Sequence, residues 1–297
     1  MSGAGLRPPV FAFVRLTRPQ FLLGGLAGCG LGAAIAFHER GALNWGAYAL
    51  AQGAVLAFQL MTHYGNDYFD RAGDARSART AFSGGSGALV DGSLAPVVGL
   101  RAALACGALG ALAALWLALT GHALGGLIAA AIGVLAWAYS APPFRLLASG
   151  WGEATATLVV GTLVPLCAYA SQTGTLDRLA LAGTLPGAGA MLATMFAVEF
   201  PDVDADRASG KRNLVVRLGK SRALRAAWAA LVSAYLGVAV ALLAGAPPTL
   251  LFFEAATLPL ALVLGRDFAR RSDGVLALRG AALFLLVTLF GLLAYLR

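Results

Sequence analysis

Two short stretches, residues 66–74 and 199–206, concentrate the acidic side chains of this sequence. Each follows a long apolar run, and together with Asp91 they hold eight of the 14 Asp and Glu residues. Ionisable groups beside apolar runs of membrane-spanning length are costly to keep there and usually serve a function. Their concentration therefore points to a site.

The spacing within each stretch predicts that several of these side chains share one face of a helix. Successive helical residues turn by about 100°, so positions three, four, seven or eight apart stay close to one stripe. The first predicted stripe holds Asn66, Asp70 and Asp74 with Asp67 near it, and the second holds Glu199, Asp202 and Asp206 with Asp204 turned away.

Carboxylates brought so close together repel one another unless a cation neutralises them. Mg²⁺ prefers oxygen ligands, keeps several waters and commonly bridges one or two carboxylates to phosphate oxygens. Basic residues after each stretch could hold the remaining phosphate oxygens. They are Arg71, Arg76, Arg79, Arg207, Lys211 and Arg212. The pattern favours a magnesium and diphosphate site over a set of solvated salt bridges.

The composition identifies an integral membrane protein that is expected to be all-α and polytopic. Hydrophobic residues make up 59% of the 297 and charged residues 12%, whereas charged residues approach about 25% in soluble domains. Nine apolar runs of spanning length surround a predicted central cavity. They lie at about 20–37, 43–63, 100–120, 122–140, 153–171, 179–199, 224–244, 248–265 and 276–296.

The distribution of Lys and Arg predicts a cytoplasmic N-terminus, because cytoplasmic loops retain these residues. This orientation places 19 of the 22 on the cytoplasmic side and leaves only Arg40, Arg178 and Arg297 on the other. Both acidic stretches then open to the cytoplasm of a bacterial or archaeal cell. The net charge of +8 lies along one membrane face, which favours anionic lipid and substrate over nucleic acid.

No soluble domain is predicted, because the longest intervals between spans are two loops, about 64–99 and 200–223. We therefore expect residues 1–297 to form one transmembrane domain. The two loops follow the second and sixth spans, which hints at two related halves facing a common cavity.

These residues resemble the UbiA-type family of membrane prenyltransferases. The first stretch fits the family's NDxxDxxxD motif at Asn66, Asp67, Asp70 and Asp74, and the second fits DxxxD at Asp202 and Asp206. Residues 210–219 are similar to the family's GKxTL and RLG stretch, and residues 139–145 to its segment after the fourth helix. Where many relatives carry YxxxK, the fourth position after Tyr139 is Pro143, so Arg145 is the candidate replacement.

The resemblance implies Mg²⁺-dependent transfer of a polyprenyl group from an isoprenoid diphosphate, through an allylic carbocation. It implies metal ligands at Asn66, Asp70, Asp74, Asp202 and Asp206. It makes Asp67, Asp70, Asp202 and Glu199 the catalytic candidates, with Asp67 and Glu199 supporting the ligands or orienting the acceptor. Candidate substrate contacts are Arg71, Tyr139, Arg145, Lys211, Arg212 and His63.

The acceptor is expected to be an aromatic ring. The first stretch is most similar to 1,4-dihydroxy-2-naphthoate polyprenyltransferases of menaquinone synthesis. Acceptors such as 4-hydroxybenzoate, homogentisate, chlorophyllide, haem and lipid stay open, as do prenyl chain length and oligomeric state. From another class, a transporter of anionic substrates would also fit the spans and charges, but it would more often place its site near the bilayer midplane.

Overall fold

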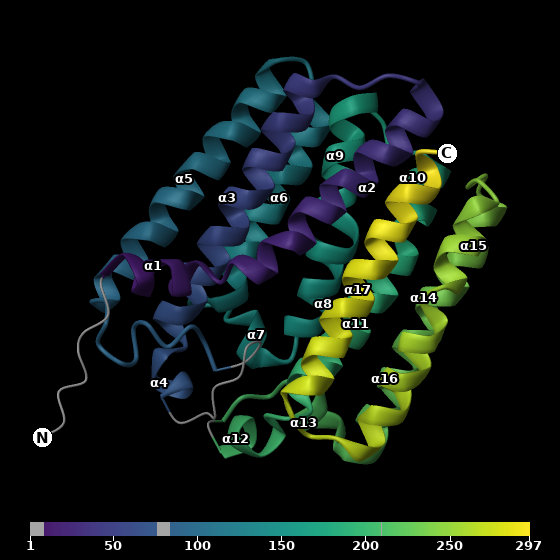
Figure 1. The fold of residues 1–297 in the computed structure, drawn as a ribbon. Helices are drawn as coiled ribbons and strands as arrows, with labels where there is room; N and C mark the ends of the chain where they lie inside the picture. The colour runs from purple at the N-terminus through teal and green to yellow at the C-terminus, as the bar shows by residue number, and fades with distance from the viewer. Residues whose placement is uncertain (1–8, 76–83, 209) are drawn as a thin grey trace, which may run out of the picture.

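Every regular element of the structure is a helix. The computed structural model describes residues 9–75, 84–208 and 210–297, and its long helices form one bundle (Figure 1). In chain order the elements are α1 (Pro9–Thr17), η1 (Pro19–Phe21), α2 (Leu22–Arg40), α3 (Trp45–Phe69), α4 (Arg71–Asp74), α5 (Pro96–Leu119), α6 (Ala123–Ser140), α7 (Leu146–Ser149), α8 (Gly152–Leu158), η2 (Val159–Leu163), α9 (Val164–Thr173), α10 (Arg178–Gly183), α11 (Leu185–Glu199), α12 (Val203–Ala208), α13 (Leu214–Leu218), α14 (Lys220–Leu243), α15 (Thr249–Ala255), α16 (Leu258–Arg270) and α17 (Gly274–Tyr295). The all-α, polytopic prediction is confirmed.

Helices occupy each of the nine places at which the sequence predicts a span. Among the described residues, seven are long and apolar enough to cross a membrane, or eight if α15 and α16, bent by 42°, form one span. The 25-residue α3 is long enough but falls outside this set, because Gln52, Gln59 and His63 lower its hydropathy. It lies against α5, α6 and α2, and this packing shields its polar side chains.

Proline interrupts one of the spans in its middle. The span from Gly152 to Thr173 consists of α8, a turn of π-helix at η2, and α9. Pro165 has no N–H to donate to the helix ladder, and the turn that precedes it widens. The inner wall of the bundle therefore departs from regular α-helix here.

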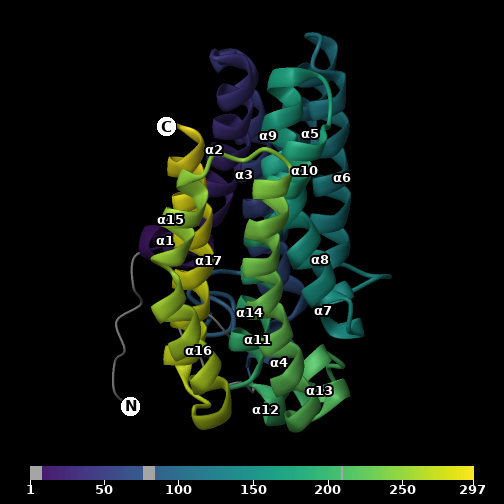
Figure 2. The ribbon, with the colours of Figure 1, turned by 90° about the vertical axis from the view of Figure 1, so that its right-hand side faces the viewer.

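The acidic stretches lie at one end of the bundle, where short helices gather. α4, α12 and α13 lie together there in both Figure 1 and Figure 2. α3 ends at Phe69, six residues beyond the predicted end of its span, and Asp70 separates it from α4. The backbone hydrogen bonds from Asp70 N–H to Asn66 and from Asp74 N–H to Asp70 continue the helical pattern. The predicted stripe is therefore preserved across the junction.

Two apolar cores pack side by side. One draws its residues mainly from α2, α3, α5, α6 and α9, and the other mainly from α11, α14, α16 and α17. Glycine allows the closest approach in the first core, because a Cβ on Gly32 of α2 would collide with the Pro165 carbonyl of α9. Residues from the helices of both cores line one cavity between them, which confirms the predicted central cavity.

Candidate active site

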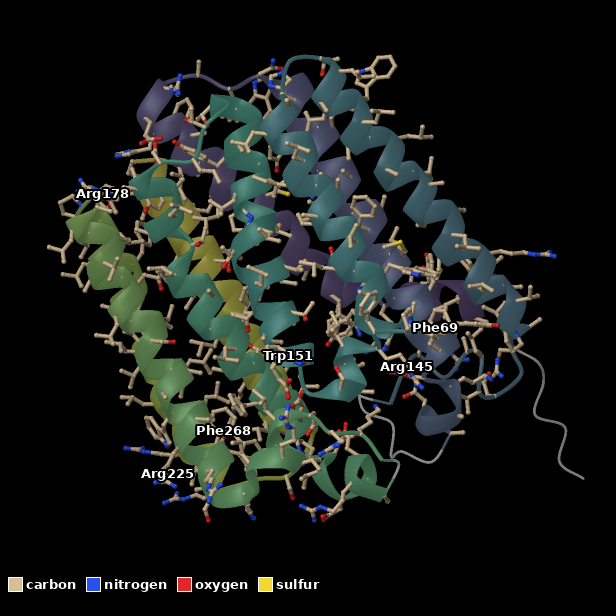
Figure 3. All side chains as sticks on the ribbon, turned by 180° about the vertical axis from the view of Figure 1, so that it is seen from behind. Phe69, Arg145, Trp151, Arg178, Arg225 and Phe268 are labelled. Atoms are coloured by element: carbon tan, nitrogen blue, oxygen red, sulfur yellow. The ribbon has the colours of Figure 1, made fainter. Side chains whose placement is uncertain are left out.

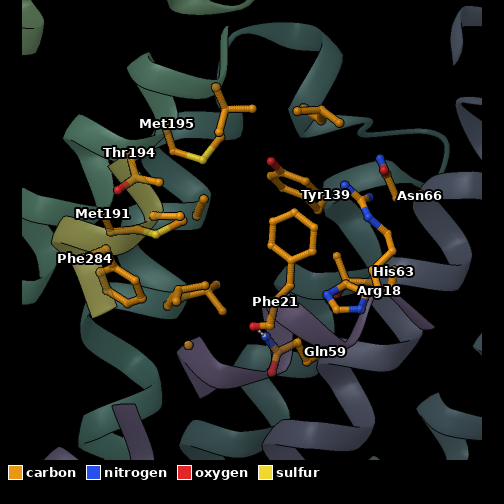
Figure 4. A pocket seen from close by; sticks show the side chains of 18 of the residues that line it. Arg18, Phe21, Gln59, His63, Asn66, Tyr139, Met191, Thr194, Met195 and Phe284 are labelled. Atoms are coloured by element: carbon orange, nitrogen blue, oxygen red, sulfur yellow. Dashed lines mark hydrogen bonds between the residues drawn. The ribbon is translucent and has the colours of Figure 1, made fainter. Parts of the chain in front are cut away.

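One cavity of about 570 Å³ contains most of the predicted site residues. One end of the cavity is lined by carboxylates, and the body of the cavity is mostly apolar. Figure 4 shows Phe21 and Tyr139 pointing into it, with His63 and Asn66 on one side and Met191 and Phe284 on the other. A ligand with a charged head and an apolar tail would match both regions.

The first acidic stretch presents Asn66 and Asp70 together. Asn66 Nδ2 donates to Asp70 Oδ2 at 3.0 Å and to Ser140 Oγ at 3.2 Å. The guanidinium of Arg145 lies 3.6 Å from Asp70 and its side chain is half exposed. Arg145 has a left-handed backbone, with φ of 44°, a conformation that non-glycine residues seldom adopt. The segment after α6 thus brings a cation to the rim of the carboxylate end.

A glycine-containing loop braces the other two carboxylates of this stretch. The Ser86 N–H donates to Asp67 Oδ2 at 3.0 Å, and the Ser86 hydroxyl also bonds Asp67. Gly84 and Gly85 line the cavity, and a Cβ at Gly85 would collide with the Asp74 carboxylate. Burial raises the pKa of Asp74 to about 6, with Lys211 opposing the rise. Ser83, which precedes Gly84 in this loop, lies outside the described residues.

The second acidic stretch contributes Asp202 and Asp206, which line the cavity. Asn213 Nδ2 donates to Asp206 Oδ2 at 2.8 Å, and Lys211 Nζ lies 3.5 Å from Asp206 Oδ1. Burial raises the pKa of Asp206, although Lys211 opposes the rise. Asp204 has a side chain that is 93% exposed and pairs with Arg207 instead, as its helical position predicts.

Lys211 connects the two stretches electrostatically. Burial by itself would lower the pKa of its ammonium group, but the carboxylates of Asp206, Asp70 and Asp74 outweigh burial and raise it. Since these carboxylates come from both stretches, the two motifs converge on one place.

The donor set fits a magnesium ion that is shared with a substrate. Among residues 9–75, 84–208 and 210–297, no three His, Cys, Asp or Glu side chains close around one point tightly enough to enclose a metal. The aspartates that line the cavity are Asp70, Asp74, Asp202 and Asp206. Separated carboxylates at a cavity end match a cation whose other ligands are water and phosphate oxygens.

Several predicted residues lie off the cavity. Arg71 and Arg212 are exposed and do not line it, and the Arg71 guanidinium lies 6.0 Å from the centre of the Tyr68 ring. Asp67 stands behind Asp74 and Gly85 without lining the cavity. His63, Tyr139 and Glu199 line it. Arg76 and Arg79 lie outside the described residues.

The structure adds two residues that the sequence did not single out. Arg18 lines the cavity, stacks 4.5 Å from the Phe21 ring centre and lies 3.9 Å from Asp67. Its left-handed backbone, with φ of 50°, turns the chain between α1 and α2. Glu153, at the start of α8, is fully buried and accepts a hydrogen bond from the Leu214 N–H. The sequence could have indicated Glu153, because a carboxylate is unusual inside an expected span. Arg18, in contrast, resembles the positive charges that commonly flank a span.

Comparison with solved structures shows that the fold is shared. The chain is similar to a UbiA homolog from Archaeoglobus fulgidus bound to GPP and Mg²⁺, with a TM-score of 0.72, 15% identity and coverage of 96% of this chain and 99% of that one. It is also similar to the apo UbiA homolog from Aeropyrum pernix K1, with a TM-score of 0.71, 17% identity and coverage of 92% and 96%.

Comparison of sequences gives one curated relative and a family. The chain is 30% identical over 139 residues to 2-carboxy-1,4-naphthoquinone phytyltransferase of Synechocystis sp. (strain ATCC 27184 / PCC 6803 / Kazusa), which is 47% of this chain and 45% of that protein. The match thus spans less than half of that relative. The profile of the UbiA prenyltransferase family matches residues 26–287, which is most of the chain. This integral membrane protein therefore belongs to the UbiA prenyltransferase family.

Proposed function

We propose that this enzyme transfers a polyprenyl group from an isoprenoid diphosphate to an aromatic acceptor, with Mg²⁺ as cofactor, in quinone biosynthesis of the menaquinone type. The observation that carries the proposal is a cavity in which an end with carboxylates and Lys211 is continuous with an apolar body. The A. fulgidus homolog bound to GPP and Mg²⁺ supports the donor and cofactor, and the partial match to the naphthoquinone phytyltransferase supports the acceptor class.

The charged end would hold the diphosphate. Candidate Mg²⁺ ligands are Asn66, Asp70, Asp74, Asp202 and Asp206. Asn66 uses its Nδ2 on Asp70 and Ser140, so its amide oxygen is the atom left for a cation. Bound Mg²⁺ would neutralise the negative charge that develops on the diphosphate as the allylic C–O bond breaks. Lys211 and Arg145 would hold phosphate oxygens that the metal leaves over.

The apolar body would hold the isoprenoid tail. Phe21, Met191 and Phe284 line it, and few polar groups face it at that depth. A dry wall keeps water from the allylic cation, so the acceptor ring captures the cation instead. Loss of a proton or a carboxyl group from the attacked carbon then restores aromaticity.

The test is product formation by the purified protein with Mg²⁺ and geranylgeranyl diphosphate. The acceptors are 1,4-dihydroxy-2-naphthoate, 4-hydroxybenzoate and homogentisate, each with and without EDTA. We expect an EDTA-sensitive prenylated naphthoate. A product on another acceptor would contradict the menaquinone assignment alone. Diphosphate binding without any prenylated product would contradict transfer to these aromatic acceptors and favour a non-aromatic acceptor or transport of an anionic substrate.

A further inference from the structure

Three exposed arginines lie without a carboxylate partner where α14 and α16 reach the carboxylate end of the bundle. Arg225 belongs to the second turn of α14, and Arg266 and Arg270 belong to the last two turns of α16. Within residues 9–75, 84–208 and 210–297, no carboxylate forms an ion pair with any of the three. Figure 3 shows Arg225 at the outside of the bundle at this end. Three positive charges therefore remain uncompensated by the described part of the chain.

The carboxylates nearest to them in the chain are already paired with other arginines. Asp267, on the same helix as Arg266, pairs with Arg279 of α17. Asp273, beyond the end of α16, pairs with Arg271. These are the two carboxylates between Arg266 and the start of α17, so this segment has none left for the exposed arginines. A counter-charge for them has to come from outside the chain.

Helix geometry turns these arginines toward one outer side of the groove between α14 and α16. The two helices touch at Trp228 of α14, whose ring would collide with a Cβ on Gly265 of α16. Successive residues turn by about 100°, so Arg225 lies about 60° around α14 from Trp228. By the same rule, Arg266 lies about 100° around α16 from Gly265. Because α14 and α16 run in opposite directions (Figure 2), both rotations lead to the same side of the groove.

Apolar side chains continue the same face toward the middle of the membrane. On α14, Val232 and Leu236 follow Trp228 by four and eight residues and are 52% and 61% exposed. On α16, Leu262 precedes Arg266 by four residues and is 51% exposed. Trp228 itself is 37% exposed and lies between the arginines and these residues, as tryptophan commonly does at a membrane interface. The face therefore changes from cationic to apolar along the helices.

We propose that the groove between α14 and α16 binds an anionic phospholipid, with the lipid phosphate at Arg225 and Arg266 and the acyl chains along the apolar part of the same face. A phosphate offers the acceptor oxygens that a guanidinium group binds with two hydrogen bonds. Basic pockets between membrane helices suit such head groups, and long arginine side chains extend toward the membrane surface to meet them. A zwitterionic lipid carries its own cation and neutralises less of the charge.

This lipid site is separate from the substrate cavity. Arg225, Arg266, Arg270 and Trp228 do not line that cavity. The inference therefore does not depend on the proposed function, and it can be tested without a prenyl-transfer assay.

Brominated lipids test where the lipid binds, because bromine on an acyl chain quenches a nearby tryptophan. The full-length protein is placed in phosphatidylcholine nanodiscs that contain a small fraction of brominated phosphatidylglycerol or of brominated phosphatidylcholine. The fluorescence of the wild type minus that of Trp228→Phe reports on Trp228. We expect brominated phosphatidylglycerol to quench this signal about fivefold more strongly, which is what one basic residue contributes at an anionic membrane surface. Equal quenching by the two lipids would overturn the proposal.

Removal of the three charges tests the role of the arginines. Native mass spectrometry of the detergent-solubilised protein, titrated with phosphatidylglycerol or phosphatidylcholine, gives the affinity for the first bound lipid. The triple variant Arg225→Gln/Arg266→Gln/Arg270→Gln should bind phosphatidylglycerol about 100-fold more weakly, at about fivefold for each charge, and phosphatidylcholine as the wild type does. The quenching measurement leaves all three arginines in place, so it decides the proposal even if this variant does not fold.

The matched control is Arg40→Gln/Arg101→Gln/Arg178→Gln, which removes three exposed arginines from other parts of the surface. It should bind phosphatidylglycerol as tightly as the wild type does. Equal weakening in the two triple variants would show that net charge alone attracts the lipid and would overturn the site. Inorganic phosphate at the same concentration as the lipid should not displace phosphatidylglycerol, because it lacks acyl chains. Displacement by phosphate would show a site for the free anion and would overturn the assignment to a lipid.

Discussion

Two aspartates of α12, two residues apart, have opposite surroundings. Asp206 is buried beside Lys211 and Asn213, whereas the Asp204 side chain is 93% exposed. If Asp206 helps to hold Mg²⁺ against the departing diphosphate, its loss should remove transition-state stabilisation. We expect Asp206→Asn to lower kcat about 100-fold or more, which is typical of losing one group that stabilises developing charge.

Asp204→Asn is the matched control for this prediction, because it makes the same change on the same helix at an exposed site. Its kcat should equal that of the wild type in the prenyl-transfer assay. Equal kcat values for the two variants would show that Asp206 does not help to hold the metal.

The buried carboxyl of Asp74 predicts a pH dependence of metal binding. Its pKa is raised to about 6, chiefly by burial, so the metal-free group is protonated below that pH, where an ordinary aspartate is still ionised. Because Mg²⁺ binds the ionised form, the added metal competes with the proton. Mg²⁺ should therefore raise the Tm of the detergent-solubilised protein at pH 7.5 and raise it far less at pH 5.

Without Mg²⁺, the contribution of Asp74 to the stability of the fold should change with pH in the opposite direction. A folded-state pKa above the unfolded value means that Asp74 destabilises the fold when ionised. Its unfavourable contribution begins to shrink as the pH falls below about 6 and is gone below the ordinary aspartate pKa of 3.8. Asp74→Asn should flatten both the metal-free profile and the dependence on Mg²⁺. An unchanged profile in that variant would assign the effect to another carboxyl group.

At the residue scale, helical spacing predicted which side chains of one helix share a face. It did not predict which side chains of distant elements approach them. Asn66, Asp70 and Asp74 share the cavity because the helical hydrogen bonds continue through the α3–α4 junction. Arg71, one residue after Asp70, turns out of the cavity by the same 100° rotation. Arg18 reaches the carboxylates from a remote segment, and a position along the sequence alone does not disclose such an approach.

In the loop before α5, Gly85 packs against the carboxylate end of the cavity. A Cβ on Gly85 would collide with the Asp74 carboxylate and reach Asp67 Oδ1 at 3.3 Å. We expect Gly85→Ala to displace Asp74 and so weaken Mg²⁺ binding about tenfold, or about 1.4 kcal/mol. Isothermal titration with Mg²⁺ and an unreactive diphosphate would measure the change.

Gly92 of the same loop provides the control, because its φ of 78° is also left-handed and nothing lies within 4 Å of a Cβ placed there. Gly92→Ala therefore carries a similar backbone strain without the collision. Equal weakening in both variants would show that strain in the loop, and not contact with Asp74, controls the metal affinity.

At the element scale, apolar length predicted where the long helices lie but not how they are broken. Runs of spanning length located every long helix, because burial in lipid demands about 20 apolar residues. The fold tolerates the polar side chains of α3 because this helix packs against α5 and α6. Composition alone does not reveal such packing. The short helices α4, α12 and α13 fall in the two long intervals between predicted spans. The helical spacing of the acidic residues predicted α4 and α12, whereas no pattern predicted α13, because tertiary contacts at the cavity end fix so short a helix.

For the molecule as a whole, the distribution of basic residues and the position of the carboxylate end indicate the same orientation in the membrane. The carboxylate end of the cavity carries α4, α12 and α13, and Arg225 lies at that end while Arg178 lies toward the other (Figure 3). Since positively charged residues are retained in the cytoplasm, this end should face it. A soluble diphosphate substrate would then reach the cavity from the cytoplasm and an isoprenoid tail would enter the apolar body.

Membrane orientation can be tested with single cysteines in a protein whose Cys29, Cys106 and Cys167 have been replaced by alanine. Asp204→Cys at the carboxylate end and Thr175→Cys between α9 and α10 both place a thiol on an exposed residue. In intact bacterial cells, a membrane-impermeant maleimide should label Thr175→Cys at once and Asp204→Cys only after permeabilisation. The reverse pattern would invert the topology and place the diphosphate site outside the cell, where cytoplasmic isoprenoid diphosphates could not reach it.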